Sequence, residues 1–125
     1  MTTYLLDSDI IIDYLAKRES TVALIEKIIQ LDELPAVSVL TEIEVKVGLK
    51  DNQIPKINKF FDALTIIPVT NDIAQLAIEF IRSFSKKGKV LHLVDTCIAA
   101  TALSNNLILI TNNKKDYPMG ELKLL

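Results

Sequence analysis

The sequence predicts an α/β fold, a three-layer α/β/α sandwich in which a mainly parallel central sheet lies between helices. Three observations predict it. Short apolar runs alternate along the chain with longer segments that have helical spacing. The run at residues 107–110 is short, branched and continuous, as in a strand buried on both faces. The segments between runs are long enough for the helical crossovers that parallel strands require, and these cover both faces of a sheet.

The first strand and the two helices after it are predicted from apolar spacing. Residues 3–6 form a short apolar run, which predicts the strand. The helix after it is predicted from apolar side chains at helical spacing, namely Ile10, Ile11, Tyr14 and Leu15. A second helix is predicted over residues 21–31, with Thr21 as its cap, and Pro35 stops it.

The middle of the chain predicts strand, helix, helix and strand. Residues 36–40 have the composition of a strand, and Thr41 then begins a helix in which Glu44 stands at the spacing of a capping box. A short helix over residues 55–64 opens with a proline, and residues 66–69 predict a strand.

The last third of the chain has the strongest helical signal. It runs over residues 72–87, and Gly88 follows as a C-cap. A further helix over residues 95–104 leads into the buried strand at residues 107–110. Residues 122–125 predict an additional edge strand.

The composition predicts one folded domain over residues 1–125, because half the residues are hydrophobic and 24% are charged. The one cysteine, Cys97, allows no intramolecular disulfide and is predicted to be a small buried hydrophobe. No stretch is long and apolar enough to cross a membrane, and the first residues lack the features of a secretory signal. We therefore expect a cytoplasmic protein without a membrane partner.

Charge and rare residues exclude several kinds of site. The formal net charge is −2, so the field of the whole molecule does not attract nucleic acid. The three glycines are too scattered for a phosphate-binding glycine loop. The single histidine, His92, offers little support for a nucleophile and base pair. Acid–base or metal chemistry must therefore be carried by carboxylates.

Acidic and amide side chains follow the predicted strands at one edge of the sheet. Asp7 follows the first strand, Glu44 lies in the first turn of the helix after the second, and Asp95 opens the helix before the buried strand, which Asn113 and Asp116 follow. The carboxyl ends of parallel strands meet at the same edge. Acids that converge without basic partners repel one another, and a cation with hard oxygen ligands, Mg²⁺ or Mn²⁺, relieves this.

Each acid also has a purely structural interpretation. Asp7 or Asp9 can cap the first helix, and Glu44 can be only the capping-box partner of the threonine before it. Asp95 can be a first-turn acid that the helix dipole favours, and Asp13 fits a solvated or locally bonded helix position. Spacing alone leaves both interpretations open.

Four ordered motifs carry a resemblance to a known family. They are LLDSDIIIDYL at residues 5–15, SVLTEIEVKVGL at residues 38–49, VDTCIAATA at residues 94–102 and ITNNKKDY at residues 110–117. Together they span nearly the whole chain and resemble the PIN-domain ribonucleases, in particular the VapC-type toxins of bacterial and archaeal toxin–antitoxin pairs. The resemblance implies a PIN-like fold and a metal-dependent endoribonuclease.

The resemblance also implies roles for individual residues. Asp7 takes the place of the family's first metal-ligating Asp, and Ser8 that of its hydroxyl residue. Glu44, rather than Glu42, takes the place of the catalytic Glu, and Asp95 that of the third acid.

The fourth motif departs from the family pattern. Thr111 matches the end of the strand, but Asn113 stands at the fourth acidic position with an uncharged amide oxygen, so it would bind a second metal less tightly. Asp116 is the candidate to supply the missing carboxylate, directly or through water. The resemblance thus implies Asp7, Glu44, Asp95 and Asp116 as catalytic residues, Asn113 as a weaker metal ligand, and Ser8 and Thr111 as supporting residues.

The implied reaction is hydrolysis of RNA phosphodiesters by a metal-activated water. Contacts to the RNA backbone are expected from one or more lysine groups, Lys46 and Lys50, Lys86, Lys87 and Lys89, or Lys114 and Lys115. The mean hydropathy of +0.32 predicts apolar surface on the folded monomer. We therefore expect a homodimer and a hydrophobic groove for a helix of the cognate antitoxin.

Two other functions stay open. The Asp7-Ser8-Asp9 segment is similar to the Asp-x-Asp motif of haloacid-dehalogenase-like phosphatases, although three isoleucines follow it and the chain is short for that fold. The replacement at Asn113 is the best sequence argument for a catalytically silent PIN-like interaction module.

Overall fold

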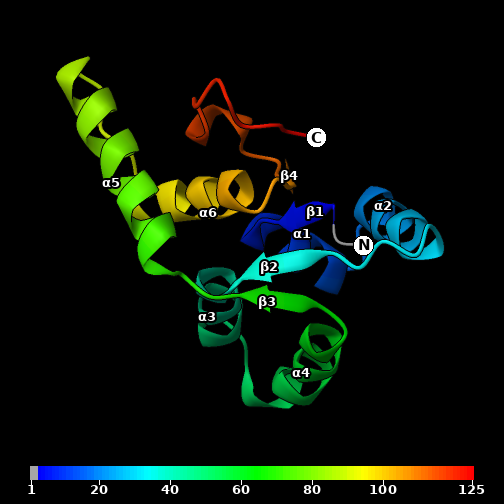
Figure 1. Cartoon of the computed structure of the whole chain (residues 1–125). Helices are drawn as coiled ribbons and strands as arrows, with labels where there is room; N and C mark the ends of the chain where they lie inside the picture. The colour runs from blue at the N-terminus through cyan, green and yellow to red at the C-terminus, as the bar shows by residue number, and fades with distance from the viewer. Residues whose placement is uncertain (1–2) are drawn as a thin grey trace.

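A parallel four-stranded sheet forms the centre of the molecule, with strand order β3-β2-β1-β4 (Figure 1). The computed structural model describes residues 3–125, so Met1 and Thr2 of the predicted domain lie outside the described residues. Leu5 pairs with Ala36 on one side of β1 and with Leu109 on the other. The strands are β1 (Tyr4–Leu6), β2 (Ala36–Ser38), β3 (Thr65–Ile67) and β4 (Ile108–Ile110).

Helices connect the strands and cover the sheet. Two short 3-10 turns, η1 and η2, accompany the α-helices. The elements in chain order are α1 (Ser8–Leu15), α2 (Glu19–Gln30), α3 (Val39–Val47), η1 (Asp51–Gln53), α4 (Ile54–Asp62), α5 (Asn71–Lys86), α6 (Leu93–Ser104) and η2 (Lys114–Asp116).

Alternate side chains of the strands pack into two hydrophobic cores, one on each face of the sheet. Leu6 and Ile110 pack with apolar side chains of α1 to α4 in one core. Leu5 and Leu109 pack with α5, α6 and the C-terminal segment in the other. Because successive side chains of a strand point to opposite faces, this division produces the three layers. The predicted α/β/α sandwich with a parallel sheet is confirmed.

Helix α6 is buried around most of its circumference. Residues 96–102 are all buried, including Cys97, as predicted from its apolar surroundings. Such a helix is apolar on every side because it lies inside the protein. Within residues 3–125, no helix is long and apolar enough to cross a membrane.

The predicted start of the helix after β2 is wrong. Strand β2 ends at Ser38 rather than at residue 40, and the Ser38 hydroxyl accepts a hydrogen bond from Leu40 N at 3.1 Å as the N-cap of α3. Thr41 is a fully buried residue within the helix, and its hydroxyl has no hydrogen-bond partner among the described residues. The predicted capping box of Thr41 and Glu44 is therefore absent, and Glu44 lies in the second turn.

Other predicted boundaries shift by a few residues. Helix α2 begins at Glu19, and Thr21 is buried within it rather than capping it. Helix α5 is capped by Thr70, whose hydroxyl accepts from Ile73 N, and the turn after it holds Gly88 at φ +81°. Helix α1 begins at Ser8, α6 at Leu93, β3 at Thr65 and β4 at Ile108.

The predicted edge strand over residues 122–125 is wrong as a full strand. Only one parallel bridge forms there, between Leu109 and Leu124. Leu109 N donates to Lys123 O and Leu125 N donates to Leu109 O, both at 2.9 Å. The C-terminal segment therefore covers the free edge of β4 without extending the sheet by a strand.

Candidate functional site

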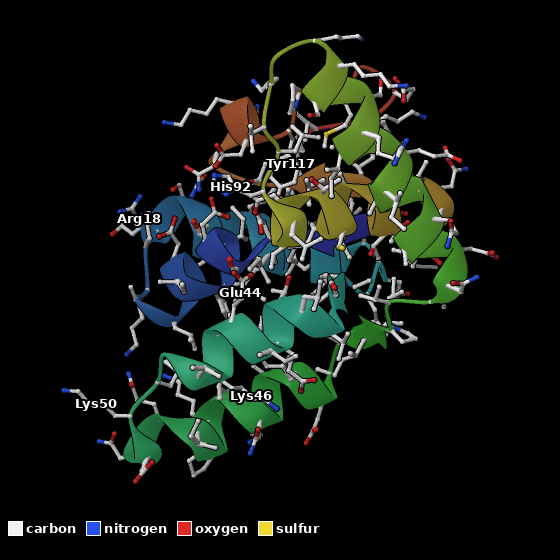
Figure 2. The ribbon with its side chains drawn as sticks, turned by 90° about the vertical axis from the view of Figure 1, so that its left-hand side faces the viewer. Arg18, Glu44, Lys46, Lys50, His92 and Tyr117 are labelled. Carbon is white, nitrogen blue, oxygen red and sulfur yellow. The ribbon has the colours of Figure 1, made fainter. Side chains whose placement is uncertain are left out.

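The acidic site residues lie at the carboxyl ends of the strands. Asp7 directly follows β1 and is the N-cap of α1, where its Oδ1 accepts from Ser8 N at 2.9 Å. Asp95 lies in the first turn of α6. Glu44 is exposed on α3, and Figure 2 shows it extending toward the side of the molecule that carries His92 and Tyr117. The predicted convergence at one edge of the sheet is thus observed.

A cavity of about 420 Å³ brings three of the predicted acids together. Its lining residues come from α3, the start of α6 and η2, and they are Glu44, His92, Leu93, Val94, Asp95 and Asp116. This hollow lies where the acids meet at the carboxyl edge of the sheet.

Asp7 is buried at 5% exposure and accepts hydrogen bonds at both carboxylate oxygens. Its Oδ2 accepts from Thr111 Oγ1 at 2.8 Å and from Tyr117 Oη at 2.9 Å. Thr111 in turn accepts from Asn113 N at 3.0 Å. Two side chains from beyond β4 therefore fix an acid that follows β1, more than a hundred residues away in sequence.

Burial and mutual repulsion act on the acids of this site. Although the Glu44 residue is exposed, partial burial of its carboxyl group is the largest cause that raises its pKa, followed by the charges of Asp7 and Asp95. A hydrogen bond with the Ser8 side chain lowers the pKa. The pKa of Asp95 is raised by burial, then by Asp7 and Asp116, and His92 and the Tyr117 hydroxyl oppose this. The carboxylates thus act on one another as a group of like charges.

Asp9 holds the loop after β4 and lies close enough to Asp7 and Asp13 for their charges to act on it. Its Oδ2 accepts from Asn112 N at 2.9 Å and from Asn113 Nδ2 at 3.1 Å. Its Oδ1 is buried and has no hydrogen-bond partner among residues 3–125. Burial is the largest cause that raises the pKa of Asp9. Asn113, predicted as a weaker metal ligand, therefore uses its amide nitrogen to hold Asp9.

Sequence reasoning missed a bridge between α1 and the loop after β4. Asp13 accepts from Asn112 Nδ2 at 2.8 Å and lies 3.6 Å from Arg18 Nη1. The prediction of a locally bonded Asp13 agrees with its ion pair to Arg18, but it missed the second partner, Asn112, which is 99 residues away. No spacing rule reports such a contact; only the fold brings α1 against the end of β4.

Sequence reasoning also assigned no role to Tyr117 and none to His92 in this site. Tyr117 is 3% exposed and its hydroxyl reaches Asp7. The available signal was its place in the fourth motif, directly after Asp116. His92 is the N-cap residue of α6 and lines the cavity beside Asp95.

The donor set suits a hard divalent cation. Carboxylate oxygens are the ligands that Mg²⁺ and Mn²⁺ prefer, and a cation relieves the repulsion that raises the pKa values of Glu44 and Asp95. In residues 3–125 no three Asp, Glu, His or Cys side chains already stand close enough to enclose an ion. Glu44 is exposed, and its side chain is long enough to move toward a cation held by the other acids.

The lysines differ in how free their ammonium groups are. Lys46 Nζ lies 2.7 Å from Glu42 Oε2 and 5.1 Å from the centre of the Phe61 ring. Its charge is therefore already paired within the protein. Lys114 and Lys115 are exposed in η2, directly before Asp116 of the cavity. In Figure 2, Lys46 and Lys50 lie on the α3–α4 side, away from His92 and Tyr117.

The chain is similar to two curated ribonucleases along most of its length. It is 30% identical over 115 residues to the protein named Ribonuclease VapC19 of Mycobacterium tuberculosis, with 92% of each chain covered. It is 28% identical over 116 residues to Ribonuclease VapC1 of Methanocaldococcus jannaschii, with 90% of this chain and 77% of that protein covered.

Solved structures share the fold. A toxin–antitoxin complex from Klebsiella pneumoniae contains a chain with a TM-score of 0.83 and 29% identity, covering 98% of this chain and 96% of that one. VapBC-1 from nontypeable Haemophilus influenzae gives a TM-score of 0.84 at 25% identity, with 99% and 97% covered. The family profile described as PIN domain matches residues 4–118. The chain therefore belongs to the PIN domain family, among the VapC ribonucleases.

Proposed function

We propose that this protein is a Mg²⁺- or Mn²⁺-dependent endoribonuclease and the toxin of a VapBC-like toxin–antitoxin pair. The observation that carries the proposal is the acidic cavity. Glu44, Asp95 and Asp116 line it, and the charge of Asp7 acts on Glu44 and Asp95. Such a group of like charges at the carboxyl edge of a parallel sheet is suited to hold a cation and a phosphate together.

Asp7, Glu44 and Asp95 are the residues proposed to hold the cation. A cation held by these residues would lower the pKa of a bound water and would stabilise charge that develops on the phosphate oxygens. Asp116 lines the same cavity and is placed to ligate through water or to orient the attacking water. Asn113 is a weak candidate for a second metal, because its amide oxygen carries no charge. Its amide nitrogen is bonded to Asp9.

Supporting residues fix the ligands before substrate arrives. The Thr111 hydroxyl donates a hydrogen bond to Asp7 Oδ2. The Ser8 backbone N–H donates to Asp7, and the Ser8 side chain forms a hydrogen bond with Glu44. Lys114 and Lys115 are proposed to contact the RNA backbone, because they are exposed in η2 directly before Asp116. These contacts position a phosphate without reading the sequence of the RNA.

The partners follow from the relatives. The similar chains from Klebsiella pneumoniae and Haemophilus influenzae come from toxin–antitoxin and VapBC complexes. We propose a cognate antitoxin for this chain, whose amphipathic helix covers exposed apolar surface, and a homodimer of the toxin. The proposed compartment is the cytoplasm, where RNA and antitoxin are both present.

The structure argues against the Asp-x-Asp phosphatase interpretation, because the second acid of that motif, Asp9, binds the loop after β4. Asp9 Oδ2 is taken by Asn112 and Asn113, and the chain belongs to the PIN family instead. The silent interaction module is the remaining alternative, and cleavage distinguishes it from the nuclease.

The test is cleavage of end-labelled cellular RNA by purified, antitoxin-free protein with Mg²⁺ or Mn²⁺. We expect the protein to cleave RNA and chelator to abolish the cleavage. Loss of a side chain that only supports a metal ligand lowers activity roughly 10–100-fold, and we expect Asp95→Asn to lower it further. Asp72→Asn is the matched control, since Asp72 is also a first-turn helix acid but lies on α5. Folded protein that cleaves nothing with either metal would leave the silent module.

A further inference from the structure

The hydroxyl of Tyr117 is a buried polar group that the proposed reaction does not yet use. Its ring packs in the core formed with α5 and α6, where the residue is 3% exposed. The hydroxyl leaves that apolar core and donates to Asp7 Oδ2 at 2.9 Å. A buried hydroxyl costs free energy unless it is bonded, so this contact is expected to be maintained in the folded protein.

The two oxygens of Asp7 are not equivalent. A carboxylate oxygen has about two sites for acceptance. Oδ2 accepts from both Tyr117 Oη and Thr111 Oγ1, which fills it. Oδ1 accepts from Ser8 N alone, so it keeps one site free.

We propose that Tyr117 is a positioning residue that, together with Thr111, fills Asp7 Oδ2 and leaves Oδ1 as the single oxygen that Asp7 offers to the cation. The inference rests on the proposed metal-dependent function and adds a residue to it. Charge-assisted hydrogen bonds to a carboxylate are short and strong, so two of them fix the plane of the carboxyl group. Side chains that orient a ligand in this way affect metal affinity although they do not touch the metal.

Tyr117 also couples the site to the C-terminal half of the fold. Its backbone N–H donates to Lys114 O at 3.0 Å, which closes η2 directly after Asp116. The same residue therefore fixes Asp7 through its hydroxyl and the turn that carries Asp116 through its backbone. Removing only the hydroxyl separates the first of these effects from the second.

The decisive variant is Tyr117→Phe, which keeps the ring in the core and removes the bond to Asp7. It also removes the effect of the hydroxyl on Asp95, so a variant that acts on Asp7 Oδ2 through Thr111 is measured beside it. The measurement is the Mn²⁺ dissociation constant of the antitoxin-free full chain by isothermal titration calorimetry, with the melting temperature recorded in chelator. We expect Mn²⁺ affinity to fall by about tenfold or more. Cleavage should fall with it at low Mn²⁺ and recover in part at high Mn²⁺.

Tyr14→Phe is the matched control, because Tyr14 stacks on Phe60 with ring centres 4.9 Å apart, in the core on the opposite face of the sheet. It should bind Mn²⁺ as the unmodified protein does. Thr111→Val removes the other donor to Asp7 Oδ2 and should weaken Mn²⁺ binding in the same direction as Tyr117→Phe.

The outcomes separate this inference from the proposed function. Unchanged or tighter Mn²⁺ binding by Tyr117→Phe would overturn the positioning role, even if the melting temperature fell, provided that Asp95→Asn still lost binding. If the unmodified chain bound no Mn²⁺ at all, the proposed metal site would fail and the role of Tyr117 with it. Weaker binding in Tyr117→Phe with normal binding in Tyr14→Phe supports the inference.

Discussion

At the scale of single residues, repulsion among the site acids links stability to pH. Burial and the charges of neighbouring acids raise the pKa of Glu44 above its ordinary value of 4.5 in the folded protein. A carboxyl group with a raised folded-state pKa binds its proton more tightly in the folded than in the unfolded state. Its contribution to stability is therefore present below the ordinary pKa and is lost as the pH rises through the raised one.

This linkage predicts the behaviour of Glu44→Gln. In chelator, the unmodified protein should lose melting temperature relative to the variant as the pH rises from about 4.5 toward 7, because only the unmodified protein then gains a charge beside Asp7 and Asp95. Thermal unfolding across that range measures the difference. Glu79→Gln on α5 is the control and should follow the unmodified protein. A constant offset between Glu44→Gln and the unmodified protein at every pH would contradict the prediction.

Asp9 gives a second prediction at this scale. Replacing it by alanine removes an acceptor of two bonds from the loop after β4 and should cost about 1–3 kcal/mol in the free energy of unfolding. Asp9→Asn keeps an oxygen for Asn112 N and should cost less. Urea unfolding of both variants measures this, and equal losses would show that the hydrogen bonds to Oδ2 do not hold the loop.

Residue roles were predictable only where a motif carried them. The order of Asp7, Glu44 and Asp95 along the chain and the rule for parallel sheets predicted that they meet at one edge. The contacts of Asp13 with Asn112 and of Tyr117 with Asp7 span 99 and 110 residues. They depend on side-chain directions at the end of β4, which periodicity does not encode.

At the scale of elements, the fold class was predictable because apolar runs and helical periodicity were both strong. The ends of elements were less so, because several residues near each end can serve as a cap. Ser38 and Thr41 both precede an acid three or four residues later, and the sequence favoured Thr41. The structure uses Ser38, since β2 ends there and places its hydroxyl next to Leu40 N.

The choice of cap predicts opposite outcomes for two small substitutions. Ser38→Ala should lower the free energy of unfolding by about 1 kcal/mol, because Leu40 N loses its acceptor. Thr41→Val should be close to neutral or stabilising, because the buried hydroxyl that it removes has no partner among the described residues. Chemical denaturation of the two variants provides the comparison. A larger loss in Thr41→Val would restore Thr41 as a bonded residue.

At the scale of the whole molecule, folding leaves several large apolar side chains in solvent, as the high mean hydropathy predicts. Ile43 and Val47 are 54% and 80% exposed and stand four residues apart on α3, so they lie on one face of that helix. Neighbouring apolar residues on an exposed helix face are typical of an interaction surface rather than of scattered exposure.

This surface predicts that the antitoxin-free protein is a dimer at micromolar concentration and that α3 contributes to the interface. Val47→Glu should shift the mass measured by light scattering toward the monomer and leave the melting temperature of the protomer nearly unchanged, because an exposed side chain contributes little to its folding. Leu31→Glu is the matched control, since Leu31 is 62% exposed at the end of α2. A monomeric unmodified protein would exclude the dimer. If Leu31→Glu breaks the dimer and Val47→Glu does not, the interface lies at the end of α2 instead of on α3. The reason is that a new charge disrupts association only where the two copies exclude water.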